Sequence, residues 1–383
     1  MFRGSISRET FLAEYWQQKP LLIRQALPAF KDPLSAEELA GLACEEEVES
    51  RLVNIKNGTW HQTSGPFTEK DFTSLPEQDW TLLVQAVDTW FTELQELYQT
   101  FDFIPDWRFD DIMVSYACQN GGVGPHFDYY DVFILQGQGQ RHWQLGQQCD
   151  ENTPLVEDST TKILKDFSPE AEYLLESGDV LYIPPGVSHQ GTSIGESLSY
   201  SIGFRAPSCT EILDEFVNEL SVKLHKHQRY RDPGLLHQKH PAEISASTLC
   251  MLTQIIKQQC EDQATLLCSF GRTMTQRKYP EQQLIPETLL GAEDFAALSA
   301  QNLMLEKHPA ARFAFAEHDG ILYLFADGEV FQRDTSDEEF RNLVMQLCDR
   351  KLTIYVLAHL AESTLALNLL CALYNQGSLL ATE

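Results

Sequence analysis

Short apolar runs separated by glycine, proline and aspartate follow one another between about residues 107 and 204. This spacing is typical of an all-β barrel or sandwich, because each run is long enough for one strand and each break supplies a turn. Two glycines flank Gln138, so we expect a hairpin turn at residues 137–139 that pairs its neighbouring strands antiparallel. The expected strands are residues 111–118, 128–135, 141–145, 173–175, 180–183 and 197–204.

Residues 1 to about 100 form a lead-in with mainly helical periodicity. Ser35 and Glu38 have the spacing of a capping box, in which each side chain bonds the backbone N–H of the other, so a helix should begin near Ala36. Residues 80–87 fit a strand or a helix equally well, whereas residues 89–97 have a helical pattern.

After residue 207 the periodicity becomes helical, and Ser208 and Glu211 form a second capping box. A polar linker over residues 224–240 is followed by two further helical segments, residues 245–260 and 263–270. The first helix carries an apolar stripe that needs a partner surface, which could be a second subunit or the barrel of the same chain. The stripe consists of Ile212, Leu213, Phe216, Val217, Leu220 and Leu224.

From about residue 286 the chain reads as a small α+β domain, with two alternating strands joined across Asp319-Gly320 and a second turn at Asp327-Gly328. Helices are expected at residues 292–298, after a cap at residues 336–339, and before Gly377, which is a C-cap candidate. Helices with a small hairpin are typical of a winged helix. Residues 287–383 hold fifteen acidic and six basic residues, so this domain is poorly suited to DNA.

The length of 383 residues exceeds one ordinary core, and we expect three parts with boundaries at residues 1–207, 208–275 and 276–383. The fold class is accordingly α+β. Nine cysteines without any Cys-x-x-Cys spacing indicate reduced thiols. No apolar run approaches the length of a membrane span and the first residues lack the pattern of a secretory signal, so we expect no membrane association and a cytoplasmic location.

The composition is strongly acidic, with 56 Asp or Glu against 28 Lys or Arg and a formal net charge of −28. Such a surface repels phosphate backbones, so direct nucleic-acid binding is not expected, and it attracts basic partners. A simpler interpretation of the acidity is a soluble surface without a specific partner.

Candidate chemistry gathers around residues 121–128, where a glycine-rich run leads to His126 and Asp128. If the run enters a strand, these two side chains project from one face, because strand side chains alternate. His189 follows a strand and a Pro-Gly turn, and its spacing from Gly178 fits the metal-binding pattern of cupin barrels. Two histidines and one carboxylate form a facial triad for Fe(II), although His-x-Asp alone occurs often by chance.

A facial triad leaves three coordination positions open, enough for a chelating co-substrate and O2. The usual co-substrate, 2-oxoglutarate, needs a cation for its distal carboxylate. Arg141 is the leading candidate, because a guanidinium binds carboxylate in a bidentate manner; an exposed hairpin arginine is the alternative. Ser115 could donate its hydroxyl to the same carboxylate, or it could be a core serine bonded to the backbone.

Several motifs together resemble the bacterial JmjC-type ribosomal oxygenases. The resemblance covers the lead-in, the barrel and the order of the three parts, and its motifs are residues 105–108, 121–128, 130–134, 139–143, 178–186, His189 and 201–207. The family implies a JmjC/cupin double-stranded β-helix barrel, a helical dimerisation region that makes a homodimer, and a C-terminal winged-helix-like domain. It also implies hydroxylation of an arginine β-carbon in ribosomal protein L-sixteen, a basic substrate, with Fe(II), 2-oxoglutarate and O2.

The same resemblance assigns roles to residues. It implies iron ligation by His126, Asp128 and His189, and 2-oxoglutarate binding by Arg141 with Ser115. For the substrate guanidinium the matching positions are Asp111, Tyr130 and Ser201. The chain departs from the family pattern at Ser199, where an asparagine is expected near 2-oxoglutarate; the shorter side chain leaves room for a water.

Two other hypotheses remain open from the sequence. One is a metal-dependent cupin-barrel enzyme that acts on a small molecule, as an isomerase or a hydrolase, with no need for Arg141 or O2. The other is a non-enzymatic regulator that binds proteins through its C-terminal domain.

Overall fold

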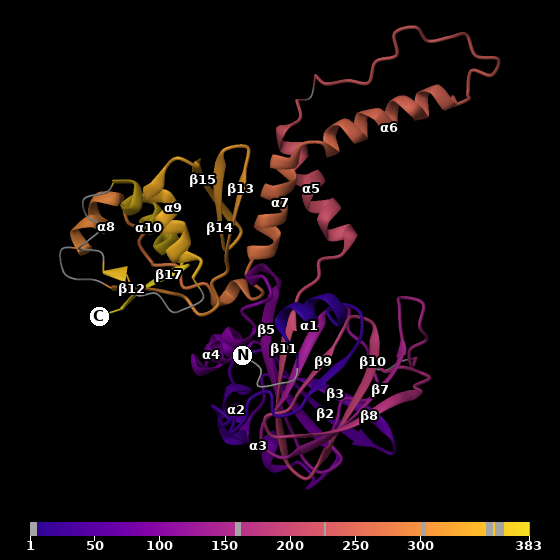
Figure 1. Cartoon of the computed structure of the whole chain (residues 1–383), viewed down its shortest axis with the longest axis vertical. Helices are drawn as coiled ribbons and strands as arrows, with labels where there is room; N and C mark the ends of the chain where they lie inside the picture. Colours follow the sequence, from indigo (N-terminus) through magenta and orange to yellow (C-terminus); the bar gives the residue numbers. More distant parts are fainter. Residues whose placement is uncertain are drawn as a thin grey trace. The chain divides into compact units, whose positions relative to one another are not determined.

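The computed structural model describes residues 6–157, 162–225, 227–299, 304–349, 355–356 and 364–382. The chain divides into two compact units. The first contains residues 1–206 and a short returning segment, residues 278–282, and the second contains residues 207–277 and 283–383. Figure 1 follows the chain through both units.

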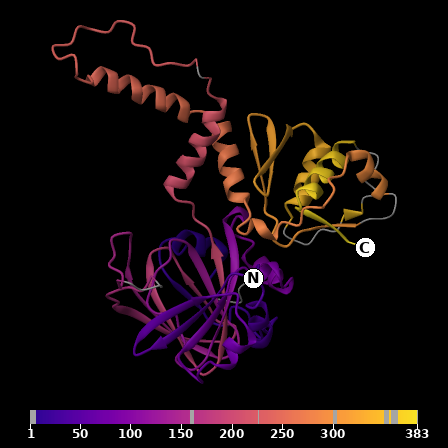
Figure 2. The ribbon, with the colours of Figure 1, turned by 180° about the vertical axis from the view of Figure 1, so that it is seen from behind.

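The first unit is a barrel made from two antiparallel sheets (Figures 1 and 2). The smaller sheet has the order β10 (Val187–Ile194), β7 (Gln140–Gln148) and β8 (Pro169–Glu176). The larger has eight strands in the order β1 (Leu21–Ile23), β9 (Val180–Ile183), β6 (Asp131–Gln136), β11 (Ser197–Phe204), β5 (Phe109–Ala117), β4 (Trp80–Val84), β2 (Ser50–Lys56) and β3 (Thr59–Ser64). The predicted barrel is confirmed.

The helices of this unit are short: α1 (Arg8–Glu14), α2 (Ala36–Leu42), α3 (Glu69–Thr73) and α4 (Glu93–Tyr98), with 3-10 turns at Val87–Thr89, Gln99–Phe101 and Asp106–Arg108. Aromatic side chains tie them to the larger sheet. Phe11 of α1 meets Tyr182 edge-on at a centroid distance of 4.9 Å, and Phe101 packs on Phe133 at 4.7 Å. All four rings are buried, and each buried aromatic contributes about 2 kcal/mol of hydrophobic stabilisation.

The expected hairpin at residues 137–139 is wrong. The chain does turn there, with Gly139 at φ +77°, but β6 and β7 lie in different sheets. β6 pairs with β9 and β11, whereas β7 pairs with β8 and β10. The chain crosses from the larger sheet to the smaller sheet between β6 and β7, so this turn signal marks a reversal of the chain without identifying the partner of either strand.

The expectation of a mainly helical lead-in is also wrong, because four strands, β1 to β4, lie within it. β2 and β3 form a hairpin across Asn57-Gly58, both at positive φ, and β4 pairs with β5 to extend the larger sheet. The ambiguous segment 80–87 is thus mostly strand. The capping box of Ser35 and Glu38 is confirmed, and α2 begins at Ala36 as predicted.

The second unit begins with α5 (Cys209–Lys223), whose capping box between Ser208 and Glu211 is confirmed. The remaining helices are α6 (Ala246–Cys260), α7 (Gln263–Thr275), α8 (Ala292–Ser299), α9 (Glu338–Leu347) and α10 (Thr364–Asn375), with a 3-10 turn of the first unit, Pro280–Gln282, between α7 and α8. One sheet contains β13 (Phe313–His318), β14 (Ile321–Ala326) and β15 (Glu329–Asp334), and another contains β16 (Tyr355–Val356), β12 (Met304–Lys307) and β17 (Leu379–Thr382).

Both predicted turns of this domain are confirmed, since Asp319-Gly320 joins β13 to β14 and Asp327-Gly328 joins β14 to β15, with all four residues at positive φ. Gly377 also has positive φ after α10, as expected for a C-cap. The cap of α9 is displaced by one residue, because the side chain of Asp337, rather than Ser336, accepts the N–H of Phe340.

The apolar stripe of α5 is only partly covered. Phe216 and Leu220 are buried, whereas Leu213 and Val217 are more than half exposed. Helix α6 buries none of its residues, and Figures 1 and 2 show no other helix or strand of the described part of the second unit packed along it. Within the described residues, no helix combines the length and apolar content that a membrane crossing requires.

Candidate metal and co-substrate site

The two histidines of the predicted triad are neighbours across a single β-bridge. The backbone N–H of His126 donates to the carbonyl of His189 at 3.0 Å, and the reverse bond is 2.8 Å. His189 follows the strand β9 and a Pro-Gly turn, as predicted, and lies within the next strand, β10; His126 and Asp128 precede β6, which begins at Asp131. The expectation that alternation along one strand aligns His126 with Asp128 is therefore wrong; the bridge and the loop bring the ligands together.

Glycines in this loop allow the close approach. A Cβ on Gly122 would lie 2.4 Å from the carbonyl oxygen of Gly191, the second residue after His189 on β10. Gly124 has φ +83°, and a Cβ there would meet Ile163 at 2.5 Å. No other residue type fits either position without moving its neighbours. The glycine-rich sequence before His126 is thus a packing requirement of the triad.

The three side chains can hold a metal ion. Their ligand atoms lie within 4.8 Å of one another, and the Nε2 of His189 is 3.6 Å from Oδ2 of Asp128. Each imidazole Nδ1 lies 2.9 Å from a backbone carbonyl, of Gly124 for His126 and of Val187 for His189. A carbonyl only accepts, so Nδ1 carries the proton and Nε2 is left with its lone pair for a metal.

Burial sets the protonation state of His189. It lowers the pKa of this imidazole to about 4, with a further lowering by His126. The neutral imidazole, which is the form that binds metals, is therefore the stable form near neutral pH.

Just beyond Asp128, Asp131 anchors the loop, because its carboxylate accepts hydrogen bonds from Arg108 at 2.9 Å and from the hydroxyl of Tyr182 at 2.6 Å.

Arg141 extends from β7 into the barrel and is buried. Its Nε donates to the hydroxyl of Ser197, and its Nη1 to the hydroxyl of Ser115, each at 2.8 Å. Its Nη2 donates to the carbonyls of the same two serines at 3.4 and 3.0 Å. No carboxylate of the described residues pairs with this guanidinium. Burial lowers the pKa of Arg141 to about 10, so the side chain remains a cation at neutral pH.

Ser199 contacts Ser115, the partner of Arg141. Its hydroxyl is 3.0 Å from the hydroxyl of Ser115, and the two residues are register partners on β11 and β5. The position where the family pattern has an asparagine is therefore occupied by one member of a buried pair of hydroxyls. The hydroxyl of Ser115 accepts from Arg141, and its own hydrogen is free to point to Ser199 or to a ligand.

One cavity of about 420 Å³ is lined by all eight residues to which the resemblance assigns a role, and by Ser199. The eight are Asp111, Ser115, His126, Asp128, Tyr130, Arg141, His189 and Ser201. The cavity is also lined by residues that the sequence analysis missed, among them Arg51, Gln85, Met113 and Trp143. Arg51 lies in β2 and Gln85 directly follows β4, within the lead-in that the sequence predicts to be mainly helical, and no motif contains either residue.

Known proteins share this arrangement. The family model described as a JmjC domain matches residues 96–212, and the one described as a ROXA-like winged helix matches residues 258–380. The ribosomal protein uL16 3-hydroxylase of Escherichia coli (strain K12) is 36% identical over 277 residues, which are 72% of this chain and 74% of that protein. The chain belongs to the JmjC-type ribosomal oxygenases.

Other ribosomal oxygenases support this assignment. A probable ribosomal oxygenase of Haemophilus influenzae is 41% identical over 211 residues, 55% of this chain and 52% of that protein. The structure of YcfD, a ribosomal oxygenase from Escherichia coli, in complex with cobalt and 2-oxoglutarate aligns over all of both chains with a TM-score of 0.84 and 30% identity. The predicted JmjC barrel with a winged-helix domain is thereby confirmed.

Proposed function

We propose that this chain is a 2-oxoglutarate and Fe(II)-dependent oxygenase that hydroxylates the β-carbon of an arginine in ribosomal protein uL16, the L-sixteen protein of the large subunit. The observation that carries the proposal is a His-Asp-His triad and a buried arginine in one cavity, an arginine with which no carboxylate of the described residues pairs. The E. coli relative named a uL16 3-hydroxylase supplies the substrate and the reaction.

The triad fits an iron ion. His126, Asp128 and His189 offer two neutral nitrogens and one carboxylate oxygen, a donor set that suits Fe(II). Bound iron would supply the activation of O2 that the hydroxylation requires. The residues of the chain fix the ligand geometry, because the two Nδ1 hydrogen bonds hold the imidazole rings in orientation.

Arg141 and Ser115 would hold 2-oxoglutarate. A buried guanidinium without a carboxylate partner is costly unless a ligand supplies the anion, and the distal carboxylate of 2-oxoglutarate is such an anion. Four contacts to Ser115 and Ser197 hold the guanidinium of Arg141, which lines the cavity, and leave one N–H of Nη1 for a ligand. A guanidinium bound in this way is preorganised for a carboxylate.

For the substrate arginine we propose Asp111, Tyr130 and Ser201, which line the same cavity as the triad. Asp111 supplies the negative charge that a desolvated guanidinium needs, while a phenol and a hydroxyl supply further acceptors. The cavity walls would hold the β-carbon near the iron and exclude water during the reaction.

We further propose that α5 and α6 form the interface of a homodimer. Leu213 and Val217 of α5 are more than half exposed, and α6 leaves Leu249 and Ile256 more than 60% exposed. A second copy of the chain would cover these apolar faces. The proposed division into a catalytic domain (1–207), a dimerisation region (208–275) and a winged-helix-like domain (276–383) follows from this interpretation.

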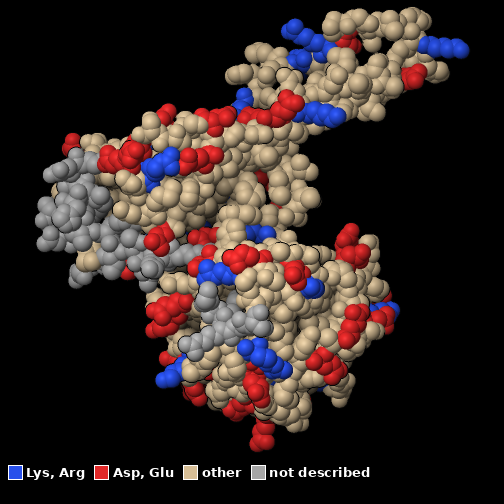
Figure 3. All heavy atoms as spheres, viewed as in Figure 1, with Lys and Arg blue, Asp and Glu red and all other residues tan. Residues whose placement is uncertain are grey.

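A basic ribosomal protein is a suitable partner for this surface. Acidic side chains are spread over the face drawn in Figure 3, so the charge would attract a basic substrate over some distance rather than through one patch. The same distribution disfavours direct nucleic-acid binding. A ribosomal substrate is consistent with a cytoplasmic enzyme.

Succinate release and mass spectrometry test the proposal together. Purified protein with Fe(II), 2-oxoglutarate and a uL16 peptide should release succinate and add one oxygen atom to an arginine of the peptide. The Asp128→Ala protein is the matched control and should do neither. Absence of product with the iron-loaded wild-type protein would reject this function.

A further inference from the structure

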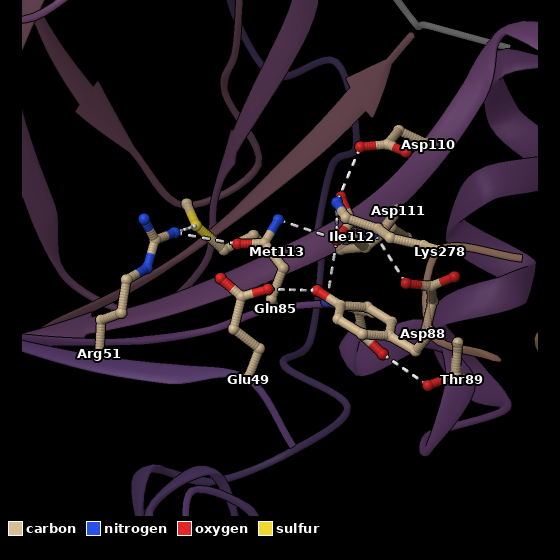
Figure 4. A network of polar contacts seen from close by, with 12 residues as sticks. Glu49, Arg51, Gln85, Asp88, Thr89, Asp110, Asp111, Ile112, Met113 and Lys278 are labelled. Atoms are coloured by element: carbon tan, nitrogen blue, oxygen red, sulfur yellow. Dashed lines mark hydrogen bonds and ion pairs between the residues drawn. The ribbon is translucent and has the colours of Figure 1, made fainter. Parts of the chain in front are cut away.

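The segment at residues 278–282 returns from the second half of the chain to the first unit. Its first two residues attach to the barrel. Lys278 donates from Nζ to Oδ2 of Asp110 at 2.8 Å and to Oδ2 of Asp111 at 3.0 Å, and the hydroxyl of Tyr279 donates to Glu49 at 2.7 Å. Figure 4 shows Lys278 directed at both aspartates. A lysine distant in sequence thus contacts Asp111, the carboxylate that is proposed to bind the substrate arginine.

Lys278 approaches Asp111 from outside the cavity. Among the described residues, those that line the cavity include Asp111 and Gln85 but not Lys278. The lysine therefore leaves the cavity open, and a substrate side chain could reach Asp111 from the other side. This placement argues against the alternative that Lys278 occupies the position of the substrate guanidinium.

The three donors to Asp111 share one oxygen. Lys278, the side-chain amide of Gln85 at 2.8 Å and the backbone N–H of Ala86 at 3.0 Å all contact Oδ2. Oδ1 accepts no hydrogen bond from the described residues. It faces Gly203, a residue of the cavity wall, because a Cβ added to Gly203 would lie 3.7 Å from this oxygen. One oxygen is thus fixed while the other is left for a ligand.

The orientation of Gln85 is fixed in turn by Arg51. Its Nη2 donates to Oε1 of Gln85 at 3.0 Å, which directs the amide NH2 of Gln85 toward Asp111 (Figure 4). The chain from Arg51 through Gln85 to Asp111 therefore has one consistent set of donors and acceptors. Together with Lys278 it holds the carboxylate in one rotamer.

Charge favours the same interpretation. Lys278 forms ion pairs with two carboxylates, those of Asp110 and Asp111. Burial raises the pKa of Asp111, and Lys278 opposes that effect. For Lys278, burial acts to lower the pKa, but the two carboxylates outweigh it and raise the pKa. Each charge thus favours the ionised form of the other.

We propose that Lys278 is a positioning residue for substrate recognition, which fixes Asp111 through Oδ2 so that Oδ1 is presented to the guanidinium of the substrate arginine. This inference rests on the proposed function and adds to it a residue that contacts neither iron, 2-oxoglutarate nor substrate. It also makes arginine recognition depend on a segment that follows the middle helices in sequence.

The test is steady-state kinetics on the full-length protein with an arginine-containing uL16 peptide. Lys278→Met should raise the KM for the peptide about tenfold, because a partly buried charge partner of Asp111 is lost. The KM for 2-oxoglutarate should stay unchanged, and Lys278→Arg should restore most of the peptide affinity. Lys31→Met removes the same charge from an exposed position of the first unit and should behave as wild type.

A double-mutant cycle separates positioning from a general structural effect. In an Asp111→Asn background, Lys278→Met should raise the peptide KM no further, because the carboxylate through which it acts is gone. Lys278→Gln, which keeps a donor without the charge, replaces Lys278→Met if that variant does not fold. A peptide KM equal to that of Lys31→Met, or the same increase in both backgrounds, would overturn the role of Lys278 alone. Failure of the wild-type protein to hydroxylate the peptide would overturn the proposed function and this inference together.

Discussion

The Nη1 atom of Arg141 lies 2.8 Å from the hydroxyl oxygen of Ser115, inside a cavity that also holds the metal triad. Four contacts to Ser115 and Ser197 fix the guanidinium, yet none of them supplies a negative charge. The positive charge is therefore available to an anionic ligand. Since the guanidinium is already oriented, a carboxylate that binds there meets little additional ordering cost.

Replacing Arg141 should affect 2-oxoglutarate far more than iron. For Arg141→Ala we expect the KM for 2-oxoglutarate to rise at least about thirtyfold, because a buried charge partner of the co-substrate is lost. The iron concentration for half-maximal activity should change little. Arg333→Ala, at an exposed position of β15, is the control. Equal shifts in both requirements would show that Arg141 does not anchor the carboxylate.

Replacing Asp128 should remove metal binding and leave the fold intact. Its side chain is 24% exposed and lies in a loop, so Asp128→Ala creates no core cavity and should change the free energy of unfolding by less than about 1 kcal/mol. Metal content after dialysis and thermal unfolding measure the two effects. Wild-type metal content in the variant would remove Asp128 from the site.

Glycine at position 122 should be necessary for the triad. The Cβ of Gly122→Ala would lie 2.4 Å from the carbonyl oxygen of Gly191, so β10 and His189 must shift. We expect metal affinity to fall at least about tenfold, as for a ligand displaced from its geometry. Gly41→Ala is the control, because nothing lies within 4 Å of its added Cβ and it lies inside helix α2. Unchanged metal affinity in Gly122→Ala would contradict the packing role of this glycine.

The oligomeric state should depend on the exposed apolar residues of α5 and α6. Introducing charge with Val217→Glu and Ile256→Glu should convert a dimer to a monomer, because a buried unpaired carboxylate costs several kcal/mol. Light scattering coupled to gel filtration measures the mass. Glu261→Lys, at the C-cap of α6, is the control, because it changes the charge without replacing an apolar side chain. A monomeric wild-type protein would exclude the proposed interface.

The sequence was sufficient for residues whose neighbours constrain them locally. His189 could be found because the pattern from Gly178 to His189 combines a strand, a turn and a ligand, and the caps at Ser35 and Ser208 predicted helix starts correctly. These signals depend on residues a few positions apart. Short patterns were therefore enough to predict the three ligands of the triad, but they did not predict that His126 and His189 pair across a β-bridge.

Long-range pairing could not be predicted in the same way. Residues 137–139 signalled a turn, but both partners of β6 are strands that occur later in the sequence. Gln85 and Lys278 lie 26 and 167 positions from Asp111, and neither belongs to a motif. Only the folded barrel brings such residues to one carboxylate. The contacts around Asp111 could therefore not be predicted from the sequence.

The central claim is tested most directly by mass spectrometry of uL16 peptide incubated with the purified protein, Fe(II), 2-oxoglutarate and 18O2. A hydroxyl group on the β-carbon of one arginine, with its oxygen derived from O2 and one succinate formed per hydroxylation, is the predicted result. No oxygen added to the peptide by protein that has a full complement of iron would contradict it.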